Sequence, residues 1–174
     1  MSLLDLIRKN REIASNDPHV SDSVRKILQA LDRMDPERAR FLAAFAYLLG
    51  RVARADLRVS DEETRMMERL VMDRGKLPED QAMIVVHMAK RQNLLFGGTE
   101  NFIVTREFKE ISTREDKLHL LECLFAVSAA DESISTIEAN EIRQIAEELK
   151  IDPEEYVQLR SAYRDYLKVF KNTL

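Results

Sequence analysis

Apolar residues recur along this chain at the spacing of amphipathic helices, and no stretch shows the strict alternation typical of a strand. Leu3, Leu4 and Ile7 form one such stripe, and a helix starting at Ser21 carries the next. We therefore predict an all-α fold, a single compact helical domain of about eight to nine helices. The later helices are expected at about residues 36–55, 61–74, 78–88, 102–108, 113–130, 135–150 and 153–167.

Several of these helices have recognisable ends. Asp35-Pro36 and Asp152-Pro153 each place a capping carboxylate before a proline in the first turn. Gly75 follows the helix over 61–74, at the position where a left-handed glycine commonly ends a helix. The helix over 36–55 is apolar around most of its surface, so we expect it at the centre of the core.

A sequence motif occurs twice in the chain. Ala55-Asp56-x-x-Val59-Ser60-x-x-Glu63 recurs as Ala130-Asp131-x-x-Ile134-Ser135-x-x-Glu138, at an offset of 75 positions (131 minus 56). The same offset pairs Pro78 with Pro153, and it aligns the apolar helices before the motifs. Such self-similarity predicts two related three-helix units packed about a pseudo-twofold axis. Within one domain over 1–174, we assign an N-terminal helical extension (1–34), a first unit (36–93), a connector (94–112) and a second unit (113–171).

The serine and the glutamate of each motif match a capping box. In this arrangement the serine hydroxyl accepts from the backbone three residues on, and the glutamate accepts from the serine's own backbone N–H. Ser60 with Glu63 and Ser135 with Glu138 both have this spacing. Each cap is worth about 1 kcal/mol. The serines and glutamates can therefore be explained without any ligand.

The two aspartates are not explained by the caps. Asp56 and Asp131 follow apolar helices, where the helix dipole disfavours a negative charge, so each needs a hydrogen bond, a cation or a metal. Each motif also copies the second half of an EF-hand loop, but residues such as Val52 replace the acidic ligands of the first half. A standard calcium loop is excluded, and only an assembled site that draws on both copies of the motif remains.

The paired motif, each copy lying between an apolar and an amphipathic helix, resembles the TerB family of tellurite-resistance proteins over about residues 41–167. A similar pattern occurs in the N-terminal domain of membrane-anchored J-domain co-chaperones. The resemblance implies an all-helical fold, a cytoplasmic stress-associated accessory role without established catalysis, and an acidic surface suspected of holding divalent metal. The residues to which it carries over are Asp56, Glu63, Asp131 and Glu138, as ligands of a cation of the Ca²⁺ or Mg²⁺ type. The family usually has glycine after the aspartate. Here Leu57 and Glu132 stand in its place, which removes easy access to positive φ.

Composition narrows the class of protein. Of 174 residues, 45% are hydrophobic and 33% charged, which is typical of a globular chain. A net charge of −4 disfavours nucleic-acid binding. The single cysteine and the lack of a secretory signal favour the cytoplasm. The longest apolar stretch, residues 41–50, is too short to cross a bilayer, so we expect no membrane insertion.

The charges around the two motifs differ. Arginines such as Arg54 and Arg58 surround the first copy and could neutralise Asp56 directly. The second copy is followed by glutamates that we expect to be unbalanced by arginines, which favours Asp131 as the metal-binding copy. These glutamates are Glu132, Glu138, Glu141, Glu147 and Glu148.

Other reactive side chains are interpreted as structural. His19, His87 and His119 form no zinc pattern, and Cys123 lies among apolar residues as a buried hydrophobe would. Tyr156, Tyr163 and Tyr166 are expected to lie on the last helix, in the core or on a face that docks a partner helix. The phenylalanines and isoleucine of the connector helix, Phe102, Ile103 and Phe108, are its expected apolar positions.

Three hypotheses about function remain. The first is a non-enzymatic TerB-like module that binds proteins, with no catalytic residues, no certain cofactor and an optional divalent metal at the acidic motif. The second is a metal-dependent enzyme that uses the same carboxylates. The third is a purely structural interaction domain in which both motifs are only helix caps. The sequence names neither the partner nor the oligomeric state.

Overall fold

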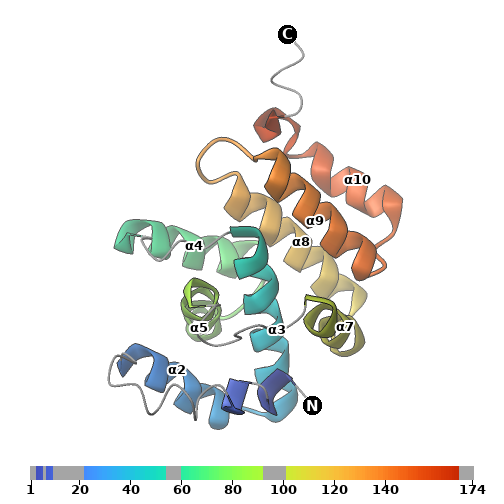
Figure 1. The fold of residues 1–174 in the computed structure, drawn as a ribbon. Coiled ribbons are helices and arrows are strands. Elements are labelled where there is room, and N and C mark those ends of the chain that lie inside the picture. Colours follow the sequence, from blue (N-terminus) through green and yellow to red (C-terminus); the bar gives the residue numbers. More distant parts are fainter. Residues whose placement is uncertain (1–2, 6, 10–21, 54–59, 92–100, 169–174) are drawn as a thin grey trace.

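The computed structural model describes residues 3–5, 7–9, 22–53, 60–91 and 101–168, and this part of the chain is all-helical (Figure 1). The predicted fold class is confirmed. The helices are α2 (Asp22–Asp32), α3 (Pro36–Ala53), α4 (Asp61–Asp73), α5 (Glu79–Lys90), α7 (Asn101–Ile111), α8 (Arg114–Ser128), α9 (Thr136–Glu148) and α10 (Pro153–Ser161), followed by the 3-10 helix η1 (Arg164–Tyr166).

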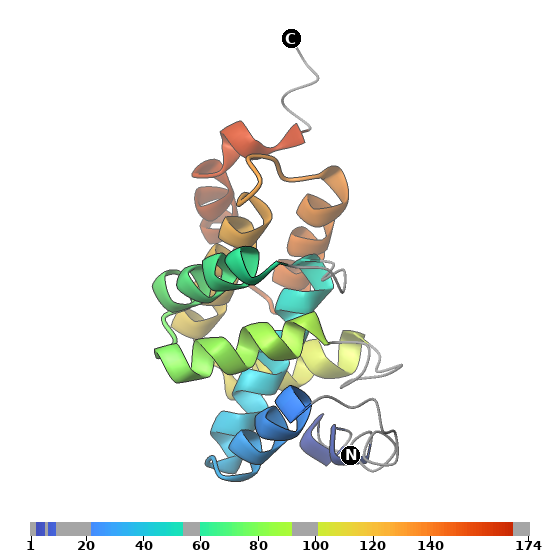
Figure 2. The same ribbon diagram turned by 90° about the vertical axis from the view of Figure 1, so that its left-hand side faces the viewer.

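Helix α3 forms the centre of the core, as its apolar surface predicts. Its N-terminus is capped by Asp35, whose Oδ2 accepts from the backbone N–H of Arg38 at 3.1 Å. Every residue from 41 to 50 is buried, and α3 is in contact with α2, α5, α7, α8 and α9. Figure 2 shows α4 and α5 lying across one side of α3. Among the described residues, no helix is both long and apolar enough to cross a bilayer.

The turn between α4 and α5 differs from the expectation in one detail. Gly75 does follow the helix, but the left-handed residue is Lys76, with a φ of 55°. Glycine is required at position 75 for space. A Cβ there would lie 2.5 Å from the carbonyl oxygen of Val71 and 3.1 Å from Cζ of Phe45.

Helix α7 buries one apolar face. Val104 and Phe108, four residues apart, lie on that face and are buried, and Phe108 contacts the rings of Phe41 and Phe45. Phe102 and Ile103, the other apolar positions that we predict in this helix, point away from that face, and Phe102 is 64% exposed. Thr105 and Glu107 are buried in polar contacts with α3 and with Leu3.

The chain leaves the helical path after α10, so the expectation of one last helix through Leu167 is wrong. Helix α10 ends at Ser161, and the next residues form turns. Tyr163 stacks on Phe125 of α8, with 5.4 Å between the ring centroids. Leu167 is buried beside Ile134, and the two residues form an isolated β-bridge. Tyr163 and Tyr156 therefore pack on the core, the first of the two arrangements that we predict, while Tyr166 is exposed.

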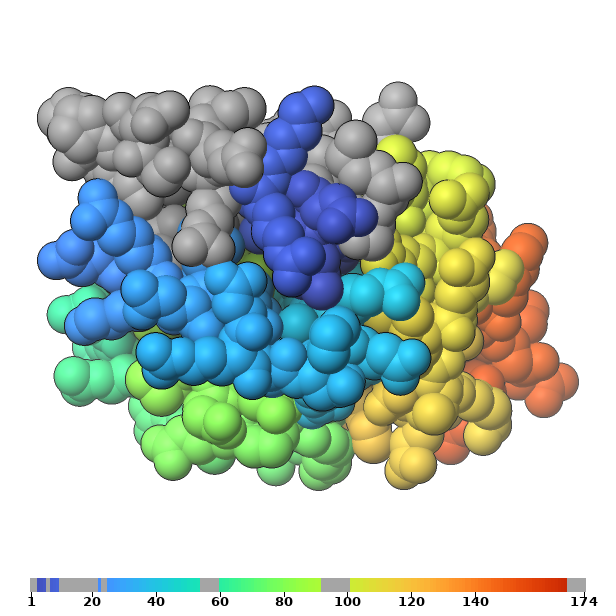
Figure 3. Space-filling model, turned by 90° about the horizontal axis from the view of Figure 1, so that it is seen from below, coloured from blue at the N-terminus to red at the C-terminus, as the bar shows by residue number. Residues whose placement is uncertain are grey.

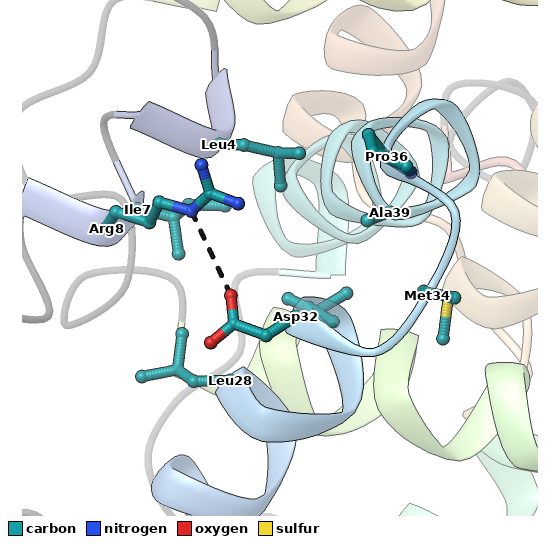
Figure 4. A pocket seen from close by; sticks show the side chains of 9 residues that line it. Leu4, Ile7, Arg8, Leu28, Asp32, Met34, Pro36 and Ala39 are labelled. Carbon is teal, nitrogen blue, oxygen red and sulfur yellow. Dashed lines mark ion pairs between the residues drawn. The ribbon is translucent and has the colours of Figure 1, made fainter.

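An N-terminal segment covers the lower end of α3 (Figure 3). Leu3 and Ile7 are buried, and the backbone N–H of Leu3 donates to Glu107 at 3.0 Å. A small cavity of about 50 Å³ lies between this segment and helices α2 and α3. At its edge Arg8 points toward Asp32, with 3.9 Å between the charged atoms (Figure 4). Residues 3–5 and 7–9 are helical, and the rest of the predicted first helix lies outside the described residues.

The two motif-bearing helices have matching bounds. Adding 75 to the ends of α4, 61 and 73, gives the ends of α9, 136 and 148. Their surroundings differ, because α4 packs mainly on α5 and α8, whereas α9 packs on α3, α7 and α8. The pseudo-twofold arrangement of two units stays a prediction.

Candidate functional site

Both motifs form the capping boxes that their spacing predicts. In the first copy, Glu63 accepts from the backbone N–H of Ser60 at 2.7 Å, and the Ser60 hydroxyl accepts from the backbone N–H of Glu63 at 3.2 Å. In the second copy, the same two bonds join Ser135 and Glu138 at 2.8 and 3.2 Å. The hydrogen bonds from Ser60 also lower the pKa of the Glu63 carboxyl, because they stabilise its ionised form.

The serine caps give a first prediction. Replacing Ser135 by alanine leaves the backbone N–H of Glu138 without its acceptor, so we expect a loss of about 1 kcal/mol of unfolding free energy. Chemical denaturation at pH 7 measures the loss. Ser161→Ala is a matched control, because the Ser161 hydroxyl is exposed and bonds only to the carbonyl of Gln158. Equal stability of Ser135→Ala and the native chain would contradict the capping account.

The second acidic loop, residues 129–135, is held in one conformation. Asp131 is exposed, and its Oδ1 accepts from the backbone N–H of Ser133 at 3.4 Å. Ile134 is buried, its N–H donates to Tyr166 at 2.7 Å, and its carbonyl accepts from Lys168 at 3.1 Å. The C-terminal segment therefore fixes this loop from one side, while the capping box fixes it from the other. This clamp could not be predicted from local patterns, because Tyr166 was expected on a continuous last helix and lies 32 positions from Ile134 (166 minus 134).

Glu132, which follows Asp131, adopts a left-handed backbone conformation. Its φ is 66°, and its N–H donates to the carbonyl of Ala129 at 2.9 Å. A positive φ is therefore reached at this position without glycine. Leu57, the corresponding residue of the first copy, lies outside the described residues.

This strain gives a second prediction. A non-glycine residue in the left-handed region costs about 1–2 kcal/mol, and the entropy of a glycine offsets part of the relief. We expect Glu132→Gly to raise the unfolding free energy by about 0.5–1 kcal/mol, measured by denaturant titration. Glu132→Ala, which keeps the strain, serves as the control. A glycine variant no more stable than the alanine variant would contradict the strain at this position.

The buried Arg51 neutralises two of the glutamates that follow the second motif. Arg51 on α3 is only 4% exposed, and its guanidinium pairs with Glu141 and Glu148 on α9. The pair with Glu148 is bidentate, at 3.0 and 3.2 Å. Arg51 also donates to the Thr105 hydroxyl of α7 at 3.2 Å, so a single side chain joins three helices. The expectation that these glutamates are unbalanced by arginines is wrong, because Arg51 reaches Glu141 and Glu148 across the fold.

The cysteine and the described histidines have surroundings typical of structural residues. Cys123 is fully buried, and burial raises the pKa of its thiol to about 12, which opposes a nucleophilic role. His87 is half-buried; burial lowers its pKa, and its Nε2 lies 3.6 Å from Glu68. His119 lies 3.9 Å from Glu115, and His19 lies outside the described residues.

The predicted metal ligands lie in the two copies of the motif. Asp131 lies in the loop before α9 and Glu138 in the first turn of α9, whereas Glu63 lies in the first turn of α4. Asp56, with Arg54 and Arg58, lies outside the described residues. Within the described ranges, no group of three His, Cys, Asp or Glu side chains is placed to hold a metal ion. The four-residue metal site therefore stays a prediction.

Comparison with known proteins identifies a family. A protein family described as "Tellurite resistance protein TerB" matches residues 41–161 of this chain. The matched range starts inside α3 and ends with α10, so it includes both capping boxes, the Arg51 network and the Asp131 loop. No curated protein and no solved structure matches the chain significantly.

Proposed function

We propose, because the chain belongs to the TerB family of tellurite-resistance proteins, that it is a non-enzymatic, stress-associated accessory module that acts in the cytoplasm by binding other proteins. Membership of the family does not by itself show how the protein works. The relation to the helical domain of J-domain co-chaperones stays a prediction.

The exposed, clamped Asp131 loop is the observation that carries this proposal. The serine and glutamate of the second motif are engaged in a helix cap, and Glu141 and Glu148 are engaged by Arg51. Asp131 takes part in neither arrangement and stays at the surface of a loop whose backbone is bonded on both sides. A fixed loop that presents a carboxylate to solvent suits recognition by a partner, because little conformational entropy is lost on binding.

Growth of the native host on tellurite tests this function. We expect deletion of the gene to lower survival on tellurite, the native gene to restore it, and Asp131→Ala to restore it only in part. Asp165→Ala is the matched control, since Asp165 is an exposed aspartate outside the loop. A deletion strain that grows like its parent would contradict the stress-associated role, and full rescue by Asp131→Ala would contradict the role of the loop.

A weak divalent-cation site at the second motif is the alternative that one observation favours. Glu132 keeps the left-handed turn that the family makes with glycine, so the loop around Asp131 retains a turn suited to an oxygen-ligand site. Asp131 and Glu138, with Asp56 and Glu63 of the first copy, are the ligands of this alternative. A metal-dependent enzyme that uses the same carboxylates is a further alternative, in which the cation would activate a bound water.

Calorimetric titration with Ca²⁺, Mg²⁺ and Zn²⁺ shows whether the Asp131 loop binds a cation or only a protein partner. If the loop binds a cation, the native chain releases heat that Asp131→Ala abolishes, while the cap variant Ser135→Ala retains it. If the native chain gives no metal-dependent heat, the cation alternative fails and the protein-binding proposal stands without it.

A further inference from the structure

A basic groove with an apolar floor lies away from the acidic loop, where two helix junctions meet. The groove has a volume of about 310 Å³ and runs between the α7–α8 junction and the α9–α10 junction. Leu118, Leu149 and Ile151 form its floor. This volume is at the low end of the range of ligand sites, about 300–1,000 Å³, so it suits one or two apolar side chains.

The rim of the groove carries an excess of positive charge. Four cations line it, Lys109, Arg114, Lys117 and Lys150, against two carboxylates, Asp152 and Glu155. The chain as a whole has a net charge of −4, so this local sign is opposite to that of the molecule.

Both carboxylates of the rim already have partners. Glu155 pairs with Arg114 across the groove. Asp152 caps α10, with Oδ1 accepting from the backbone N–H of Glu154 at 2.9 Å and of Glu155 at 3.4 Å. The three lysines are not neutralised in this way. Lys117 donates to the carbonyl oxygen of Ser112 at 3.3 Å, and across the described ranges no ion pair involves Lys109, Lys117 or Lys150.

We propose that this groove binds an acidic peptide segment of a partner protein, with an apolar side chain on Leu118, Leu149 and Ile151 and carboxylates at the three lysines. Charge complementarity of this kind selects the partner and speeds its association. An apolar anchor in a pocket supplies the larger share of binding energy in such interfaces. The proposal goes beyond the proposed function, since the groove is separate from the Asp131 loop and does not depend on tellurite or on a cation.

Fluorescence anisotropy with the full chain and the labelled peptide EDELFDED tests the proposal. We expect saturable binding that weakens by about tenfold when salt screens the lysines. The peptide EDESSDED, which keeps the acids but lacks the apolar anchor, should bind at least about tenfold more weakly. Equal binding of the two peptides, or no binding of EDELFDED, would overturn the proposal.

Charge variants locate the binding. Lys109→Glu/Lys117→Glu should weaken the binding of EDELFDED by at least about tenfold. Arg33→Glu/Arg65→Glu changes the net charge equally at exposed positions away from the groove, and should weaken it by less than about twofold. Equal losses of peptide affinity in the two variants would contradict binding at this groove.

A third variant separates binding from folding. Lysines near helix C-termini also stabilise helices, so the charge reversals could act by lowering stability. Lys150 has a φ of 59°, which glycine adopts without strain, so Lys150→Gly removes a charge of the groove while keeping the fold. We expect its peptide affinity to fall about threefold with no loss of thermal stability. Unchanged affinity would show that Lys150 takes no part and would overturn the three-lysine site.

Discussion

Replacing Arg51 by methionine is expected to lower the unfolding free energy by about 3 kcal/mol. Removing one partner of a buried ion pair costs about 3–5 kcal/mol, because the other charge stays behind uncompensated. The low end applies here, since Glu141 and Glu148 are 27% and 22% exposed and keep some hydration. Methionine retains the apolar volume of the arginine stem, so the loss reports mainly on the charges.

Two controls isolate the Arg51 network. Arg74→Ala removes an arginine that is 46% exposed and pairs with Glu122, and it should cost less than about 1 kcal/mol. Arg51→Met/Glu141→Gln/Glu148→Gln removes the two stranded charges as well, and should recover much of the lost stability. If Arg51→Met and Arg74→Ala cost the same, the network is not a structural joint.

The Arg51 effect should depend on pH. Burial alone would raise the pKa of Glu148, but the hydrogen bonds and charge of Arg51 outweigh it, and the folded-state pKa lies below the ordinary value of 4.5. The stability from this pair is therefore fully present above pH 4.5 and is lost as the pH falls through the lower folded-state value. Denaturation curves of the native chain and Arg51→Met should converge in acid. If the difference in unfolding free energy between the two proteins stays constant into acid, Arg51 and Glu148 do not form an ionised pair.

Replacing Gly75 by alanine is expected to cost about 2 kcal/mol, the next largest effect. The added Cβ would lie 2.5 Å from the carbonyl oxygen of Val71, which belongs to the α4 backbone and cannot rotate away. It would also press on Phe45 in the core. Overpacking of this kind typically costs about 1–3 kcal/mol.

The neighbouring residue provides the control for Gly75. Lys76 has a φ of 55°, so Lys76→Gly relieves strain and should raise stability by about 0.5–1 kcal/mol. Opposite signs at adjacent positions, measured by thermal or denaturant unfolding, would establish that Gly75 is needed for space. If Gly75→Ala is neutral, the close approach to Val71 does not exist in solution.

Local patterns predicted the parts of this fold that depend on nearby residues. The capping boxes of Ser60 and Ser135 were predictable because both partners lie within one helical turn. The position of α3 in the core followed from its apolar surface. The handedness of the turn at Glu132 was not predictable, because the expectation rested on glycine alone and a glutamate can adopt the same φ at a cost.

Long-range contacts account for what the sequence could not predict. Arg51 meets Glu141 and Glu148, 90 and 97 positions away, and no local spacing identifies such partners. The bridge between Ile134 and Leu167 draws the chain out of the helix that its periodicity favours. At α7, the partners of the buried polar residues Thr105 and Glu107 include Arg51 and Arg40, 54 and 67 positions away, which no local pattern identifies.

Ser135, Glu138 and Arg51 hold the framework of the second motif, and Asp131 lies at the surface, where we propose that it binds a partner. The unfolding free energy of Asp131→Asn, measured in the presence of a chelator, tests this division most directly. We expect a change within about 0.5 kcal/mol of zero, or a slight gain, because a negative charge near the C-terminus of α8 is removed. A loss of about 2 kcal/mol or more would show that Asp131 is a compensated part of the framework, and would contradict its role as a surface residue.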